Sequence, residues 1–405
     1  MKNRLKKLIP NQDFTFKQVV IITVITLFLG VFSGFFITHF AIRKNVLPGH
    51  RVIDRQLRDF IEVYHTLNTE YFQELDKNEL ISGAIKGMLE TIDDPHTIYL
   101  DSDVTDNFNV RLQGSFNGVG LEIVRDREGR TVVLNPFEDG PAYKAGIRTG
   151  DIITRVDDQD ISESPITETS AMIKGPVGTY VEITVNRNNE ERSFKIQRET
   201  ITIRSVTSEV MEIDNQKIGY ININIFSSLT TDQFNEELRK LRRENVDALI
   251  IDVRSNAGGY LNSVHDILSN FLTRDDVLYQ IETSRRTTKR HGRGTNQVDL
   301  PVVVLVNERS ASAAEILAAA LKESYGAYVV GVTTHGKGTV QQPRRLSTGG
   351  MFKFTTQNWL TPEGNRVEES GVPPTHEVRL NENFFREPTR DNDNQLQKAI
   401  ELLTK

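Results

Sequence analysis

The sequence predicts an α/β protein that carries a smaller β-rich domain, a helical N-terminal region and one apolar segment near the N-terminus. Three observations predict this arrangement. Strand-like and helix-like stretches alternate from about residue 210 to 375, short β-branched runs fill 113–200, and the stretch 19–40 contains no charged residue. Alternating strands and helices favour a mostly parallel sheet, and short runs bounded by Gly, Asp and Asn favour a compact β domain.

Length and composition narrow the possible functions. The chain has 405 residues, 38% of them hydrophobic, which allows two or three domains with full cores. The net charge of −6 is spread without long runs and does not indicate nucleic acid as a partner. The absence of cysteine from the sequence excludes disulfides, thiolate zinc sites and a cysteine nucleophile.

The stretch Val19 to Phe40 predicts a transmembrane helix, because its length spans roughly 30 Å, the thickness of a bilayer core. Five basic residues and one acid precede it, so the positive-inside rule places the N-terminus in the cytoplasm, although Arg43 and Lys44 follow as a weaker counter-signal. A cleaved signal peptide is the alternative, but the apolar stretch is long for one and lacks a convincing cleavage site. We therefore expect a single-pass anchor in the cell membrane and residues 45–405 outside the cytoplasm.

The elements outside the β-rich domain follow from periodicity and turn residues. The N-terminal region is expected to hold a helix in RQLRDFIEVYHTLNTEYF and another over 79–92, ending before Asp94-Pro95. His96 is interpreted as structural. The polar segment 284–297 is interpreted as a solvated loop, and the alternative is that its basic part, 285–293, binds an anionic partner. Further strands are expected at 218–226, 246–254, 301–306 and 327–332, further helices at 230–245, 260–272 and 313–323, and a last short helix near the C-terminus that is compatible with a homodimer.

The strand-to-helix corner after 301–306 carries the first candidate catalytic residue. It reads NERSASAAEILAAALKE, from Asn307 to Glu323. Ser312 and Glu315 fit a capping box, and capping alone is a sufficient explanation of this segment. A catalytic interpretation needs a base from elsewhere, because a serine hydroxyl is a poor nucleophile until a neighbouring base takes its proton.

The segment GVTTHGKGTVQQ offers that base. As a phosphate-binding loop it lacks the magnesium-binding hydroxyl, because Gly338 follows the lysine, and no helix follows to cradle a phosphate. Lys337 can accept the proton of Ser312 if burial lowers its pKa by about three units, and Gln341 can fix the rotamer of the lysine. His335 is the alternative base, because residues two apart on an extended strand share a face.

Acyl transfer also needs hydrogen-bond donors for the oxyanion of the tetrahedral intermediate. DVRSNAGGY places a Gly-Gly pair at the C-terminal end of a strand, where open α/β sheets hold their sites. The amides of Gly259 and of Ala313, directly after the serine, are the candidate donors. An ordinary glycine loop is the alternative, and each motif is weak alone, but together they predict a hydrolytic site.

With these segments the chain resembles the carboxyl-terminal processing peptidases, the tail-specific serine proteases of family S41. The likeness rests on SASAAEILAAAL, LIIDVRSNAGGYL, GAIKGMLETIDDPHTIYL and GKGTVQ, and it covers residues 50–400. It implies a crotonase-like α/β protease core without a metal or an organic cofactor. It also implies Ser312 as nucleophile, Lys337 as general base, Gln341 as the partner of the lysine, and Gly259 and Ala313 at the oxyanion positions.

The β-rich region resembles a PDZ domain, because PAYKAGIRTGDIITRVDD matches the core of that domain and GVGLEI matches its carboxylate-binding loop and the strand that follows. In such a loop successive backbone amides capture a terminal carboxylate, and the peptide adds a strand to the sheet edge. Peptide contacts are therefore expected at Gly118, Val119, Gly120 and Leu121. A plain surface loop is the alternative.

The sequence thus predicts a membrane-anchored, extracytoplasmic serine endopeptidase whose substrates are proteins or peptides with unstructured carboxyl tails. Two other functions stay open, a non-catalytic PDZ scaffold in which Ser312 is only a cap and a crotonase-type acyl hydrolase. The expected boundaries are 1–18 for the cytoplasmic N-terminus, 19–42 for the anchor, 45–112 for the helical region, 113–200 for the PDZ domain, 201–380 for the protease domain and 381–405 for the helical tail.

Overall fold

The structure, a computed structural model, describes residues 55–294 and 298–405 together with a few isolated residues between 15 and 26. It divides into two compact units, 1–80 and 81–405. The expected transmembrane segment, 19–42, lies almost wholly outside the described residues. Among the helices that the structure does describe, none combines the length and the apolar character needed to cross a membrane.

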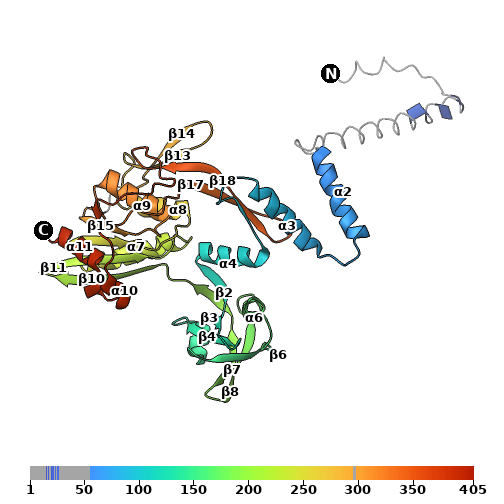
Figure 1. The fold of residues 1–405 in the computed structure, drawn as a ribbon, viewed down its shortest axis with the longest axis horizontal. Coiled ribbons are helices and arrows are strands. Elements are labelled where there is room, and N and C mark those ends of the chain that lie inside the picture. The colour runs from blue at the N-terminus through green and yellow to red at the C-terminus, as the bar shows by residue number, and fades with distance from the viewer. Residues whose placement is uncertain are drawn as a thin grey trace, which may run out of the picture. The chain divides into compact units, whose positions relative to one another are not determined.

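The N-terminal region is helical, as expected, and leads into the second unit. Helix α2 spans Arg55–Glu70 and helix α3 spans Lys77–Glu90 (Figure 1). Strand β1 (Ile98–Leu100) and helix α4 (Ser102–Gln113) follow. Proline has no amide hydrogen and restricts the residue before it, so the chain turns at Asp94-Pro95 instead of continuing as a helix.

A two-stranded ribbon lies where the chain enters and leaves the β-rich domain. Strands β2 (Ser115–Gly118) and β9 (Glu199–Thr202) pair antiparallel where the chain begins and ends the domain. Its main sheet has the order β3-β4-β5-β7-β8 and packs with two short helices around a buried apolar core. The elements are β3 (Leu121–Arg125), β4 (Thr131–Pro136), α5 (Pro141–Ala145), β5 (Ile152–Val156), β6 (Gln159–Asp160), α6 (Ile166–Ile173), β7 (Tyr180–Arg187) and β8 (Glu190–Gln197).

The α/β region is built on a six-stranded sheet of order β10-β11-β12-β15-β16-β19. The strands from β11 to β19 pair in parallel, which confirms the mostly parallel sheet, and β10 is an antiparallel edge. Every residue of the two central strands is buried, as their unbroken apolar runs predict. The strands are β10 (Val206–Ile213), β11 (Gln216–Ile223), β12 (Ala248–Asp252), β15 (Val302–Val306), β16 (Tyr328–Gly331) and β19 (His376–Glu377).

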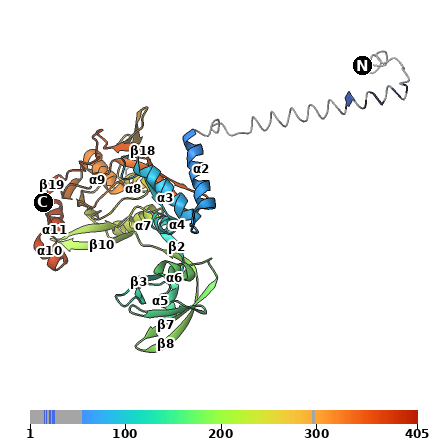
Figure 2. The ribbon, with the colours of Figure 1, turned by 45° about the vertical axis from the view of Figure 1, so that its right-hand side comes forward.

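Helices cover both faces of this sheet (Figures 1 and 2). Side chains point alternately to the two faces of a strand, so Leu249 and Ile251 join a core that contains α8 and α9, whereas Ile250 packs with Leu396 of α11. The helices are α7 (Thr230–Arg243), α8 (Leu261–Leu268), α9 (Ala313–Ala320), α10 (Glu382–Arg386) and α11 (Asn394–Leu403). The helix expected over 313–323 leaves α-helical geometry at Leu321 and ends in a π-helical turn, Leu321–Tyr325.

A second sheet, of order β1-β18-β13-β14, was not expected from the sequence. The loop interpretation of 284–297 is wrong in part, because β14 (Thr287–His291) forms a hairpin with β13 (Val277–Glu282). Its basic side chains stay mostly exposed on this edge strand, where solvent and not a core receives them. Strand β18 (Met351–Leu360) also pairs with β17 (Thr339–Arg345), and β17 directly follows the segment that carries the candidate lysine.

Candidate active site

The predicted catalytic residues meet at one cavity of about 400 Å³. It is lined by Ser312, Lys337, Gln341, Gly259 and Ala313, which come from three separate chain segments. Apolar side chains complete its walls, chiefly Leu112, Ile225, Leu261, Ile316 and Trp359. The alternative base, His335, is exposed and does not line this cavity, so the structure does not bring it together with the serine.

Ser312 stands at a strained corner between β15 and α9. Its φ is +54° and its ψ is −113°, a conformation that residues with a side chain rarely adopt. The capping box with Glu315 is present, and the Glu315 carboxylate accepts a hydrogen bond from the Ser312 amide at 2.7 Å. Such strain persists only where the surroundings fix it and is common at functional sites. Capping and catalysis are therefore compatible at this residue.

The Gly-Gly pair lies against the serine. A side chain at Gly258 would bring its Cβ to 2.8 Å from the Ser312 Cβ, and one at Gly259, where φ is +143°, would bring it to 2.1 Å from the Phe226 carbonyl oxygen. Only glycine fits either position. Within the part of the chain that the structure describes, the amides of Gly259 and Ala313 have no acceptor, so both can donate to an oxyanion.

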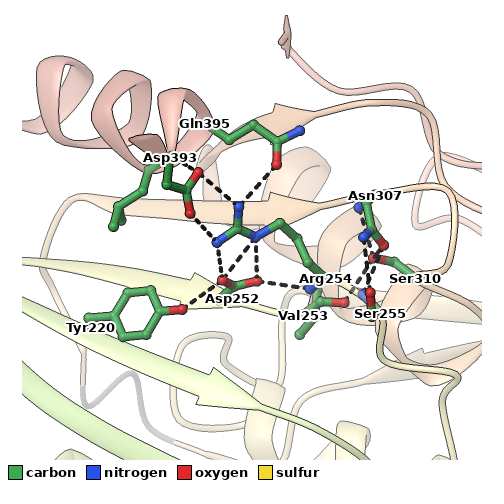
Figure 3. A network of polar contacts seen from close by, with 10 residues as sticks. Tyr220, Asp252, Val253, Arg254, Ser255, Asn307, Ser310, Asp393 and Gln395 are labelled. Atoms are coloured by element: carbon green, nitrogen blue, oxygen red, sulfur yellow. Dashed lines mark hydrogen bonds and ion pairs between the residues drawn. The ribbon is translucent and has the colours of Figure 1, made fainter. Parts of the chain in front are cut away.

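A polar network holds the glycine loop beside the serine loop (Figure 3). Ser310, which the sequence analysis did not assign a catalytic role, is fully buried and donates from its hydroxyl to the Val253 carbonyl oxygen at 2.8 Å. The Asn307 side chain accepts from the Ser255 amide at 2.8 Å. Both contacts join the end of β15 to the end of β12, which positions the glycine loop relative to Ser312.

The same network ties the C-terminal helix to the sheet (Figure 3). The guanidinium of Arg254 pairs with Asp252 at 2.6 Å and with Asp393 at 2.8 Å, and Tyr220 donates to Asp252 at 2.7 Å. All three charged side chains are largely buried. The mutual pairing compensates for the cost of burying them, so the residues before α11 fix the start of the glycine loop.

Glu315 connects the serine segment to the lysine segment, a role that the sequence analysis missed. Its side chain is fully buried in α9. Oε1 accepts from the Thr334 hydroxyl at 2.6 Å and from the Gly336 amide at 2.7 Å. Oε2 accepts from the Ser312 amide at 2.7 Å and from the Lys337 amide at 2.9 Å. One carboxylate thus fixes the backbones of both candidate catalytic residues.

Lys337 is held from its carbonyl side as well, because the indole of the buried Trp359 donates to its carbonyl oxygen at 2.8 Å. Its side chain is half-buried, and burial lowers the pKa of Lys337 below its ordinary value. The nearby ammonium of Lys353 lowers the same pKa further, and the carboxylates of Glu368, Asp94 and Glu315 raise it. No ion pair of Lys337 occurs among the residues described.

Gln341 lines the cavity together with Lys337, and among the described residues no hydrogen bond joins the two. The Nε2 of Gln341 donates to the hydroxyls of Thr339 and Thr355 at 2.9 and 3.3 Å. The Thr355 amide donates in turn to the Thr97 hydroxyl at 3.2 Å, and that hydroxyl donates to Asp94 at 2.6 Å. The turn at Asp94 thus supports Gln341 through two threonines.

His96 stands near the lysine segment rather than in an isolated turn. Its Nε2 lies 4.0 Å from a carboxylate oxygen of Glu368, and the other oxygen of Glu368 accepts from the Gly338 amide at 2.6 Å. Burial lowers the pKa of His96, and so does the positive charge of Lys337. His96 does not line the cavity, which is compatible with the structural role that the sequence analysis gave it.

The predicted peptide-binding loop connects β2 to β3. Val119 is fully buried in the domain core, and Gly118, Gly120 and Leu121 surround it in the chain. A cavity of about 730 Å³ is lined mainly by α4, β2 and α6, with Ile123 as its residue from β3, and none of the four predicted residues lines it. One face of α4 borders this cavity. Three other residues of the same helix, Phe108, Arg111 and Leu112, line the cavity that holds Ser312.

A serine at the start of a buried helix, a half-buried lysine at the same small cavity, and an attached β-rich domain are the features of a serine peptidase of modular architecture. Residues 217–378 match peptidase family S41, residues 118–197 match the PDZ domain, and residues 42–104 match the N-terminal domain of the activating protease CtpB.

Sequence relatives that are named as proteases support the same assignment. The chain is 34% identical to the carboxy-terminal processing protease CtpB of Bacillus subtilis over 87% of its own length and 75% of the relative's, and 32% identical to CtpA of the same organism over 79% and 68%. A CtpA-like serine protease of Staphylococcus epidermidis is 34% identical over 77% of this chain, which spans 63% of that relative's length. Among solved structures, the photosystem II D1 C-terminal processing protease is 26% identical, with 87% of this chain and 98% of that one covered and a TM-score of 0.47.

The chain therefore belongs to peptidase family S41, among the carboxy-terminal processing proteases, and carries a PDZ domain.

Proposed function

We propose that this protein cleaves peptide bonds near the carboxyl ends of unstructured tails, with Ser312 as nucleophile and Lys337 as general base. The observation that carries the proposal is the shared cavity, because it brings Ser312, Lys337 and two unpaired backbone amides to one place. A lowered lysine pKa supports it, since only the neutral amine can accept the serine proton.

The chemistry then follows from the groups that line the cavity. The amine of Lys337 takes the hydroxyl proton as Ser312 attacks the scissile carbonyl, and the amides of Gly259 and Ala313 donate to the oxyanion. The lysine returns its proton to the leaving amine, and the same lysine activates the water that clears the acyl-enzyme. Gln341 keeps its carbonyl oxygen for the amine of Lys337, because its amide nitrogen is engaged by Thr339 and Thr355.

The PDZ domain selects the tail in this proposal, through the loop from Gly118 to Leu121. The test compares two disordered peptides that differ only in a free or an amidated carboxyl end. We expect amidation to raise KM about ten-fold or more, because the charge-assisted hydrogen bonds to the carboxylate are lost. Equal cleavage of the two peptides would contradict tail selection but not peptidase activity, and a Ser312→Ala variant can then trap natural substrates for sequencing of their ends.

The two other functions predict different results. A non-catalytic scaffold would bind both peptides without cleaving them and would show no covalent labelling of Ser312 by a serine-reactive probe. A crotonase-type hydrolase would cleave a thioester and spare both peptides. The PDZ domain favours the peptidase over the crotonase-type hydrolase, and the cavity shared by Ser312 and Lys337 favours it over the scaffold.

We further propose that the segment 19–42 anchors the protein in the cell membrane with the catalytic domain outside the cytoplasm, and that the terminal helices support a homodimer. The support is the apolar character of 19–40 and the excess of positive charge before it. Washing membranes with carbonate at high pH should leave the full-length protein in the membrane fraction. Its release into the supernatant would contradict a spanning anchor.

A further inference from the structure

A second lysine faces the candidate catalytic lysine. Lys353 lies in β18, where it pairs with Pro343 of β17 on one side and with Ile98 of β1 on the other. It is half-buried and lines the same cavity as Ser312 and Lys337. The mechanism above does not use Lys353, and its place in a central strand position beside the reacting groups requires an explanation.

Burial lowers the pKa of Lys353 below its ordinary value, and an aromatic ring beside the ammonium acts against this effect of burial. The Nζ of Lys353 lies 5.4 Å from the centre of the Phe108 ring, a distance at which the ring face attracts a cation. Within the described part of the chain Lys353 has no carboxylate partner. An aromatic face favours the ammonium form without cancelling its field, so the positive charge remains effective across the cavity.

Charged groups face Lys337 from every element around it, and they oppose one another. The carboxylates are Glu315 of α9, Asp94 of the turn before β1 and Glu368 of the loop after β18. The cationic or titratable groups are Lys353 of β18, His96 of the same turn and Arg111 of α4. The three carboxylates favour the charged form of the lysine. Lys353 is the half-buried cation that acts against them.

We propose that Lys353 is a positioning residue for catalysis whose ammonium keeps the amine of Lys337 unprotonated at neutral pH. Two like charges in a small cavity with many apolar wall residues repel each other strongly, and the pair titrates as a unit in which the first proton is held where it is best stabilised. The Phe108 ring provides that stabilisation at Lys353. Lys337 then stays neutral and able to accept the serine proton.

This inference rests on the proposed function, because it explains how Lys337 stays unprotonated and able to act as the general base. The direction of the pKa change agrees with it, since Lys353 lowers the pKa of Lys337 second only to burial. The consequence is a specific change in the pH dependence of cleavage. The acidic limb of kcat/KM reports the pKa of the base in the free enzyme, so removing the charge of Lys353 should move that limb.

The experiment measures kcat/KM of the full-length protein in detergent between about pH 5 and 10. In Lys353→Met, which keeps the length of the side chain, we expect the acidic limb to shift upward by roughly half a unit to one unit. Cleavage at neutral pH then falls about three- to ten-fold and converges on the wild-type value above the limb. Lys353→Arg, which keeps the charge, should retain the wild-type limb, and added salt should reduce the difference between Lys353→Met and wild type.

Two controls separate this charge effect from other causes. Arg111→Met removes an exposed cation from the same cavity and should shift the limb less. His96→Gln in the Lys353→Met background should leave the shifted limb in place, which shows that the limb does not belong to the histidine. Thermal unfolding confirms that each variant is folded, and Lys353→Gln replaces Lys353→Met if the latter is not.

The outcomes are distinct. A limb that superimposes on the wild-type limb in Lys353→Met overturns the proposal, and so does an equal loss of activity at every pH, which indicates a purely structural or substrate-binding role. Normal cleavage by a Lys337→Met variant would contradict the proposed function itself. A loss of cleavage in Lys337→Met together with an unmoved limb in Lys353→Met would contradict only the role of Lys353.

Discussion

A Lys337→Met variant is expected to lose about three to four orders of magnitude in kcat/KM on a disordered tail peptide, the size of a general-base contribution. Methionine fills the apolar cavity with a side chain of similar length but has no amine to accept the serine proton. The contacts of the Lys337 backbone with Glu315 and Trp359 involve only its amide and carbonyl, so they remain. We therefore expect the fold to persist while the chemistry stops.

The comparison with Ser312→Ala shows whether the two residues act as one unit. Groups that act together in one step are not additive, so Ser312→Ala and the double variant should lose about as much activity as Lys337→Met alone. Lys289→Met, on the exposed edge strand β14, is the matched control and should cleave normally. Wild-type cleavage by Lys337→Met would remove the lysine from the mechanism, whatever the result at Ser312.

The candidate site residues were predicted from several local patterns taken together, because each pattern is weak alone. The buried strands β12 and β15 are unbroken apolar runs, so their ends are recognisable, and the polar residues that follow such strands mark the edge of the sheet. Ser312 lies shortly after the end of β15, and Lys337 lies shortly after the end of β16. The order of the elements was therefore sufficient to bring Ser312 and Lys337 together.

The second sheet and the supporting contacts have no comparable signal. Strand β18 reads MFKFTTQNWL, with lysine, threonine and glutamine among its apolar residues, and its partners β1 and β13 are distant in the chain. Lys353 lines the cavity, and Thr355 contacts Gln341, only because those pairings exist. The role of Glu315 was hidden for another reason: the capping box already explains a glutamate at that position, and its contacts with Thr334 and Gly336 depend on the tertiary fold.

Glu315→Gln is expected to lower both the free energy of unfolding and kcat. Both effects follow from replacing one carboxylate oxygen with an NH₂ group. The carboxylate accepts two hydrogen bonds at each oxygen, and in the amide one oxygen becomes an NH₂ group that cannot accept. In either orientation at least one buried backbone amide then loses its acceptor. We expect a loss of about 1–3 kcal/mol in the free energy of unfolding, measured by denaturant titration.

The catalytic effect follows from what the same oxygens hold. Oε2 joins the amide of Ser312 to that of Lys337, so a shift of one segment changes the distance over which the proton moves. A displacement of about 1 Å is sufficient to cost about 10²-fold in rate. The apolar walls of the cavity do not depend on Glu315, so we expect kcat to fall and KM to change little.

Glu323→Gln is the matched control, because Glu323 accepts one backbone hydrogen bond, from the Glu363 amide, in an exposed position. It should keep both kcat and stability close to the wild-type values. A Glu315→Gln variant that lost stability but kept the wild-type kcat would show that Glu315 only caps α9. Because the strained backbone at Ser312 is fixed by the same carboxylate that fixes the lysine, we expect instead that stability and kcat fall together.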